Sequence, residues 1–117
     1  MEKPRVLLTA PIHSDGVKIL ESFADVVIAS KPLKTEDELI NVVRDFDAVI
    51  SMGFEPFTKN VLEKASKLLV VARHGVGYDN IDVDAATRLG IWVSITPIEE
   101  LFDAVADHAM ALLLCLA

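Results

Sequence analysis

The sequence has few of the residues that mark secreted or nucleic-acid-binding proteins. It contains one cysteine, Cys115, which excludes an intramolecular disulfide and favours a reducing compartment, so we expect a cytoplasmic protein. Lysine and arginine total 11, against 18 aspartate and glutamate residues, and the net charge is -7. Because the phosphates of nucleic acids are bound by clustered basic residues, nucleic acid is not an expected partner.

Signals for membrane insertion, export and metal binding are also missing. Residues 109–117 form an apolar run that is too short to cross a bilayer, so no membrane partner is expected. The amino end enters an apolar run without a signal-peptide core or cleavage site. Cys115 lies inside the apolar run 109–117 and is interpreted as a small core residue rather than a nucleophile. No metal site is expected, because no usual ligand spacing joins His13, His74, His108 and Cys115.

What the sequence does contain is a regular alternation of apolar runs and helical segments. Hydrophobic residues make up 52% of the 117 residues, enough for one domain with a real core. The alternation predicts an α/β fold, a five-stranded parallel sheet with helices on both faces and strand order 2-1-3-4-5, which is a flavodoxin-like three-layer arrangement. The expected strands cover residues 5–10, 25–29, 47–51, 68–72 and 91–95.

Capping residues mark the boundaries of the expected helices. Thr35, with Glu38 three residues on, forms a capping box that predicts a helix through Arg44. Gly90 is placed to end a helix over residues 82–89 as a left-handed C-cap. The other expected helix starts are Ser14 or Asp15, Thr58, and Asn80 or Asp82.

A glycine loop follows the fourth expected strand, and the rest of the fold is arranged around it. Gly75 and Gly77 bracket Val76, so the loop can take positive φ or let a ligand approach its backbone without meeting a Cβ. Successive backbone N–H groups at the carboxyl end of a parallel strand suit a carboxylate, which local dipoles would hold despite the acidic chain. The alternative is that the glycines only serve a tight strand-to-helix turn.

The last segment, residues 99–117, begins amphipathic and ends apolar on all sides. A helix of this kind has to be buried by other protein. We therefore expect residues 99–117 to connect to a further domain or to form a homodimer with a second copy of the chain.

Three stretches of the sequence, ARHGVGYDNIDVDAATRLGIWV, Pro97 and AVADHAMALLL, resemble the substrate domain of the D-isomer-specific 2-hydroxyacid dehydrogenases. This family includes phosphoglycerate dehydrogenase and glyoxylate or hydroxypyruvate reductase. The resemblance covers essentially the whole chain and implies a substrate-binding domain over residues 1–98, joined by residues 99–117 to an absent Rossmann domain. That absent domain would bind NAD or NADP and carry the catalytic Arg, Glu and His. The implied reaction is oxidation of a small D-2-hydroxyacid or reduction of the 2-oxoacid.

The resemblance also implies roles for individual residues of the glycine loop. The substrate carboxylate would meet the backbone amides of Val76 and Gly77, with Gly75 giving access. The Met52–Gly53 loop would close one side of the site. Val105 matches a position near the cofactor phosphates, where it offers packing or backbone contact.

No catalytic residue is expected in this chain, because neither His74 nor His108 matches the family's catalytic histidine. No dinucleotide is expected to bind this chain alone, since Asn80 stands where the third glycine of a dinucleotide fingerprint would be. The chain by itself is therefore expected to be inactive.

The sequence departs from the family pattern in two places. Met52 stands where phosphoglycerate dehydrogenases can place an arginine, which favours a smaller hydroxyacid. The segment 97–103 is about one residue longer than usual and lacks both the Gly after Pro97 and an Asn near the helix start, so the helix entrance is expected to be rebuilt. The alternative function is a freestanding flavodoxin-like binding or signalling module. That reading is weak, because Thr9 and Ser51 stand where a receiver domain needs acidic residues.

Overall fold

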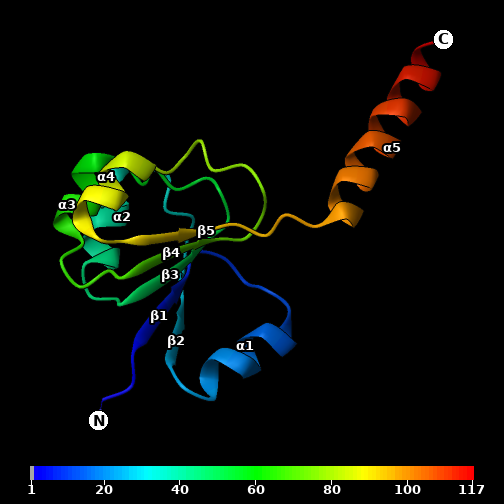
Figure 1. Cartoon of the computed structure of the whole chain (residues 1–117). Helices are drawn as coiled ribbons and strands as arrows, with labels where there is room; N and C mark the ends of the chain where they lie inside the picture. The colour runs from blue at the N-terminus through cyan, green and yellow to red at the C-terminus, as the bar shows by residue number, and fades with distance from the viewer. Residues whose placement is uncertain (1) are drawn as a thin grey trace.

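Five parallel strands form one sheet in the computed structural model, which describes residues 2–117 (Figure 1). The predicted α/β fold and the strand order β2-β1-β3-β4-β5 are confirmed. The elements in chain order are β1 (Arg5–Leu8), α1 (Ser14–Glu21), β2 (Asp25–Ile28), α2 (Glu36–Val43), β3 (Ala48–Ser51), α3 (Lys59–Lys64), β4 (Val70–Arg73), α4 (Val83–Leu89), β5 (Trp92–Ser94) and α5 (Glu99–Leu116).

Different helices cover the two faces of the sheet (Figure 1). Leu7 and Val71 are fully buried in the larger core, together with side chains of α2, α3 and α4. Val6 and Leu8 alternate with Leu7 along β1 and are buried on the opposite face, against α1. The expectation of helices on both faces is therefore met, with the larger core on the side of α2, α3 and α4.

The face that carries α1 is covered over β1 and β2 but left open over β4 and β5. Strand register pairs Ala48 with Val70 and Val70 with Trp92, so these side chains share the α1 face. Trp92 is 74% exposed there. The open half of this face thus presents an aromatic side chain of the edge strand β5 to solvent.

Most of the predicted helix caps are confirmed. The Thr35 hydroxyl accepts from the Glu38 amide at 3.3 Å, and the Glu38 carboxylate accepts from the Thr35 amide at 3.2 Å. Thr58 and Asp82 cap α3 and α4, and Gly90 ends α4 with φ 72°. Helix α1 does begin at Ser14, but the predicted capping residue, Ser14 or Asp15, is wrong.

The residue that caps α1 is His13, whose Nδ1 accepts from the Asp15 amide at 3.2 Å. A neutral imidazole nitrogen is a hydrogen-bond acceptor like a hydroxyl or carboxylate oxygen, although the usual list of capping residues omits histidine. The fourth strand is also shifted from the expected residues 68–72. It begins at Val70 and ends at Arg73, so Arg73 lies in the sheet rather than in the loop.

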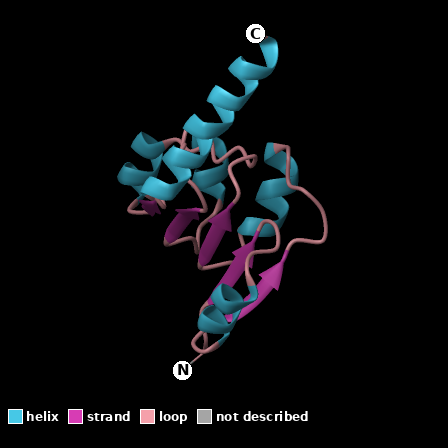
Figure 2. Cartoon of the chain, turned by 90° about the vertical axis from the view of Figure 1, so that its right-hand side faces the viewer, coloured by secondary structure: helices cyan, strands magenta, loops and turns pink. Residues whose placement is uncertain are grey.

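Helix α5 projects away from the sheet and its helices (Figures 1 and 2). None of its residues is buried, and Ile98, its N-cap, makes no side-chain capping bond. Cys115 is exposed, so its interpretation as a core residue is wrong within the described part of the chain. The reason is that the C-terminal part of α5 extends away from the sheet and its helices (Figure 1). Among residues 2–117, no helix is long and apolar enough to cross a membrane.

The capping box of α2 gives a prediction about pH. Hydrogen bonds from Lys31 and from the Lys34 and Thr35 amides lower the pKa of Glu38 from its ordinary value of 4.5 to about 2. Because the pKa is lowered on folding, the stabilisation is complete above pH 4.5 and is lost as the pH falls from about 4.5 to about 2. Glu38→Gln should therefore flatten the dependence of the unfolding free energy on pH in this window.

Urea denaturation at a series of pH values measures this slope. Glu63→Gln is the matched control, because Glu63 is an exposed carboxylate on α3, 3.7 Å from Lys59. Identical slopes for Glu38→Gln and the unmodified chain would contradict the role given to Glu38.

Candidate functional site

The predicted site lies in a cavity of about 620 Å³ beyond the carboxyl ends of β3 and β4. In open parallel sheets this is the edge where ligands bind. Met52, Gly75, Val76, Gly77 and Val105, all expected at the site from the sequence, line this cavity. The remaining lining residues are Arg73, His74, Thr96, Ile98 and Leu101.

Several amides of the glycine loop are free within the described chain, and two adjacent ones, those of Val76 and Gly77, belong to residues that line the cavity. The Gly75 amide donates to Arg73 O at 2.9 Å, and Gly75 O accepts from the Thr96 amide at 2.9 Å, which fixes the start of the loop. By contrast, the amides of Val76 and Gly77 donate no hydrogen bond within residues 2–117. Two successive free N–H groups beside a cavity form a concavity that suits an anion.

Two of the site glycines have a positive φ. Gly75 has φ 146° and Gly53 has φ 99°, conformations that a side chain makes costly. Gly77, for which the sequence left positive φ and open access as alternatives, does not have a positive φ. A Cβ added to Gly77 would have Asp79 Oδ1, at 3.6 Å, as its nearest neighbour. The role of Gly77 is therefore to leave the loop backbone open to a ligand, not to allow a strained backbone conformation.

Arg73 is a site residue to which sequence reasoning gave no role. Its Nε donates to Gly77 O at 2.8 Å, and its Nη1 donates to His74 O. A Cβ on Gly53 would lie 2.4 Å from Arg73 Nη2, and one on Gly75 would lie 2.5 Å from Nη1. The guanidinium therefore lies between the two loops, in space that both glycines leave empty. Its position two residues before Gly75 was the available sequence signal.

The Met52–Gly53 loop is held by a buried carboxylate. Glu55 is 3% exposed and accepts from Ser51 Oγ at 2.6 Å and from the Gly53 amide at 3.2 Å. Asn80 Nδ2 donates to Glu55 O at 3.0 Å, which joins this loop to the end of the glycine loop. These bonds fix both walls of the cavity to the same scaffold.

Comparison with known sequences decides the family. The sequence profile of the family described as D-isomer specific 2-hydroxyacid dehydrogenase, catalytic domain, matches residues 6–111. The chain belongs to this family. The resemblance inferred from the glycine loop and the alanine-rich helix is thereby confirmed.

Two curated dehydrogenase relatives show how much of the enzyme this chain represents. A glyoxylate reductase from Pyrococcus furiosus is 42% identical over 116 residues, which are 98% of this chain and 34% of the relative. A D-3-phosphoglycerate dehydrogenase from Methanocaldococcus jannaschii is 41% identical over 113 residues, 97% of this chain and 21% of the relative. The chain therefore spans about a third of the first and a fifth of the second.

Solved structures share the fold. A protein from Thermus thermophilus aligns with a TM-score of 0.86 at 32% identity, covering 97% of this chain and 36% of that one. A 3-phosphoglycerate dehydrogenase from Entamoeba histolytica, solved with NAD+ bound, aligns with a TM-score of 0.67 at 26% identity, covering 81% and 33%.

The residues of this dehydrogenase chain do not by themselves suit a dinucleotide. A dinucleotide site binds the phosphates at a glycine-rich turn directly before a helix. Here α4 begins only at Val83, six residues after Gly77, and has seven residues, so the chain has no such turn at the glycine loop. Val105 is 64% exposed on α5 and can offer only packing or backbone contact.

His74 and His108 lie in different elements of the structure. His74 lines the cavity, His108 lies on α5, and both side chains are exposed. No group of three or more His, Cys, Asp or Glu side chains within residues 2–117 could hold a metal ion.

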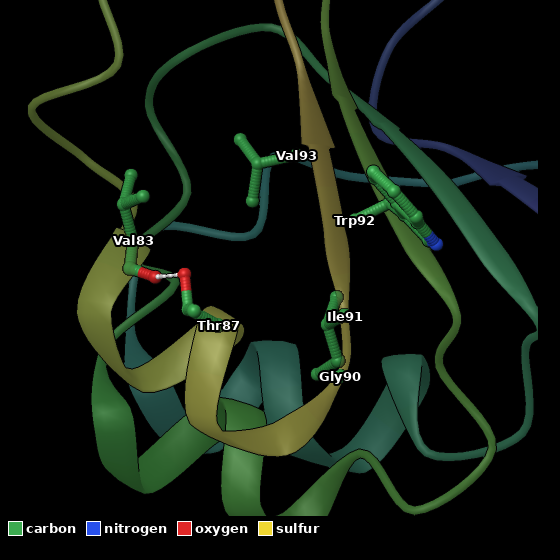
Figure 3. Close-up of a pocket in the computed structure, with 6 residues that line it drawn as sticks. All are labelled: Val83, Thr87, Gly90, Ile91, Trp92 and Val93. Carbon is green, nitrogen blue, oxygen red and sulfur yellow. Dashed lines mark hydrogen bonds between the residues drawn. The ribbon is translucent and has the colours of Figure 1, made fainter.

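A second cavity, of about 380 Å³, lies between α4 and β5 (Figure 3). Its polar side chain is that of Thr87, whose hydroxyl donates to Val83 O at 2.8 Å and so is already used within the helix. The cavity is lined by Val83, Thr87, Gly90, Ile91, Trp92 and Val93. Its lining holds no titratable side chain and therefore offers no acid or base chemistry.

Proposed function

We propose that this chain is the substrate-binding domain of an NAD- or NADP-dependent oxidoreductase that interconverts a small D-2-hydroxyacid and its 2-oxoacid. The observation that carries the proposal is the pair of free amides of Val76 and Gly77, beside the cavity and the Arg73 guanidinium. Membership of the dehydrogenase family and the similarity to glyoxylate reductase support it.

The residues of this chain would bind and orient the substrate. The Val76 and Gly77 amides donate to its carboxylate, and Gly75 lets the carboxylate approach the backbone. The Met52–Gly53 loop closes the opposite wall and excludes water from the bound acid. NAD or NADP, when bound, would supply hydride transfer to or from C2 of the substrate, with a proton joining or leaving the C2 oxygen.

In this proposal residues 1–98 form the substrate-binding domain and residues 99–117 connect it to a cofactor domain. Val105 would pack near the cofactor phosphates. The catalytic side chains would come from that further domain, as the family resemblance implies. We also place the enzyme in the reducing cytoplasm, in keeping with its exposed free thiol, Cys115.

The test is an assay of the full-length protein and of the 117-residue chain side by side. The full-length protein should oxidise NADH or NADPH with glyoxylate or hydroxypyruvate, and in reverse should accept D- but not L-hydroxyacids. The 117-residue chain should show no turnover, because its residues do not suit a dinucleotide. The proposal fails if the full-length protein reduces no 2-oxoacid with either cofactor, or if the short chain turns over alone.

The site gives little support to the alternative of a freestanding signalling module. Thr9, at the end of β1, is 4% exposed, donates to Ile50 O at 3.3 Å and accepts from the Met52 amide at 3.1 Å. Its hydroxyl is therefore used inside the fold, and Ser51 beside it bonds to Glu55. Neither position resembles an exposed acidic phosphorylation site.

A further inference from the structure

The Arg73 guanidinium has hydrogen-bonding capacity that the fold does not use. An arginine carries five N–H groups, and the described contacts use two, from Nε to Gly77 O and from Nη1 to His74 O. The other N–H groups, on Nη1 and Nη2, have no acceptor within residues 2–117. Both bonds are to neutral carbonyls, which hold the group in place without neutralising it.

The charge of Arg73 is also uncompensated in the described part of the chain. The ion pairs within residues 2–117 join His13 to Asp15, Lys31 to Glu38 and Lys59 to Glu63. No carboxylate lies within 4.0 Å of Arg73, although the chain carries 18 acidic residues. A partly buried cation that lines a cavity and lacks a counter-ion is suited to receive an anionic ligand.

The guanidinium lies on the Met52–Gly53 side of the glycine loop. Its Nη2 is the atom that a Cβ on Gly53 would meet, at 2.4 Å, and its Nη1 is the atom that a Cβ on Gly75 would meet, at 2.5 Å. It thus extends from Gly75 toward the opposite wall, whereas the free amides belong to Val76 and Gly77. The cavity of about 620 Å³ has room for an acid that reaches both points.

We propose that Arg73 is a specificity-determining residue that binds a second anionic group, a carboxylate or a phosphate, on the tail of the 2-oxoacid. This inference rests on the proposed function, in which the first carboxylate lies on the Val76 and Gly77 amides. Met52 was interpreted as favouring a smaller hydroxyacid, because it stands where an arginine can bind a phosphate. In this proposal Arg73, on the neighbouring strand β4, supplies that positive charge instead, so the substrate is an acid with an anionic tail. Arg73 pairs with Ser51 in the register of β3 and β4.

The experiment uses the full-length enzyme and two matched pairs of 2-oxoacids. Oxaloacetate and 2-oxobutyrate differ by a tail carboxylate, and 3-phosphohydroxypyruvate and hydroxypyruvate differ by a phosphate. Arg73→Met should lower kcat/KM for the anionic member of a pair roughly tenfold to a hundredfold more than for its neutral partner, the usual range for one charge-assisted contact. The loss should appear mainly in KM, since Arg73 touches the tail and not the reacting carbon.

Two further variants separate recognition from a structural effect. Arg73→Lys keeps the charge but loses the planar fork, so its discrimination should be intermediate. This variant also carries the test if Arg73→Met does not fold, as judged by its Tm. Arg88→Met is the charge-matched control, because Arg88 is an exposed residue in the last turn of α4 and should leave all four substrates unchanged.

The outcomes distinguish this inference from the proposed function. Discrimination in one pair alone identifies the tail group as phosphate or as carboxylate. Equal losses for both members of both pairs, or a wild-type enzyme that uses only the neutral members, would overturn the role of Arg73 while leaving the proposed function intact. Absence of wild-type activity on all four acids would instead refute the proposed function.

Discussion

Replacing Gly75 by valine in the full-length protein is expected to raise the KM for a 2-oxoacid roughly tenfold or more, because a side chain held at a positive φ costs of order 1–3 kcal/mol. Gly75 has φ 146°, and a Cβ there would lie 2.5 Å from Arg73 Nη1. The guanidinium can move aside only by breaking its bonds to the His74 and Gly77 carbonyls. Both effects displace the free amides of the loop.

Gly77→Val is the matched comparison, since it adds the same side chain two residues away. Its backbone is not at positive φ and its Cβ would meet only Asp79 Oδ1 within 4 Å. We expect it to impair substrate use by crowding the amides, but less than Gly75→Val. Equal KM values for the two variants would show that the backbone conformation of Gly75 does not matter to the site.

Gly90→Ala is the control for a side chain placed at a positive φ away from the site. Gly90 has φ 72° as the C-cap of α4, with nothing within 4 Å of an added Cβ. Gly90→Ala should therefore lower stability by about 1 kcal/mol and leave KM unchanged. Steady-state kinetics and thermal unfolding of the three variants separate loss of the loop conformation from loss of the fold.

The 117-residue chain is expected to self-associate through α5, and the double substitution Leu112→Glu with Leu116→Glu should make it monomeric. Leu112 is 53% and Leu116 86% exposed on a helix none of whose residues is buried. Hiding about 300 Å² of apolar surface contributes roughly 7 kcal/mol at about 25 cal/mol per Å². That is comparable with the whole stability of a small domain, about 5–15 kcal/mol.

Sedimentation equilibrium of the chain and its variants tests this homodimer. Ile19→Glu is the control, because Ile19 is 66% exposed on α1, away from α5. The control should keep the association of the unmodified chain. A monomeric unmodified chain with a stably folded α5, or a double variant that still associates, would contradict the prediction.

Local signals in the sequence predicted much of the fold. Thr35 and Glu38 specify the start of α2 by mutual hydrogen bonds, and Gly90 specifies the end of α4 by its left-handed backbone. Both depend on a few neighbouring residues, so they can be recognised without knowing the tertiary structure. The parallel direction of the strands follows in the same way, because capped helices between apolar runs serve as crossovers between parallel strands.

The features that sequence reasoning missed depend on contacts between distant segments. Arg73 belongs to the site because the pairing of β3 with β4 places Gly53, just after β3, against its guanidinium. The residues next to Arg73 in the sequence do not indicate that Gly53 lies there. The φ angles of Gly75 and Gly77 differ although the two residues look alike in sequence. Cys115 is exposed because α5 leaves the sheet, which its apolar composition alone did not predict.

The most direct measurement of the substrate loop is an NMR titration of the full-length protein, labelled with 15N in glycine and valine only. Oxalate, which resembles the carboxylate end of a 2-oxoacid, is added in the presence of the cofactor. We predict that the Val76 and Gly77 amide resonances shift together and saturate at the concentration at which oxalate inhibits the enzyme. Saturable inhibition by oxalate that leaves both resonances unmoved would contradict the assignment of these amides to the substrate carboxylate.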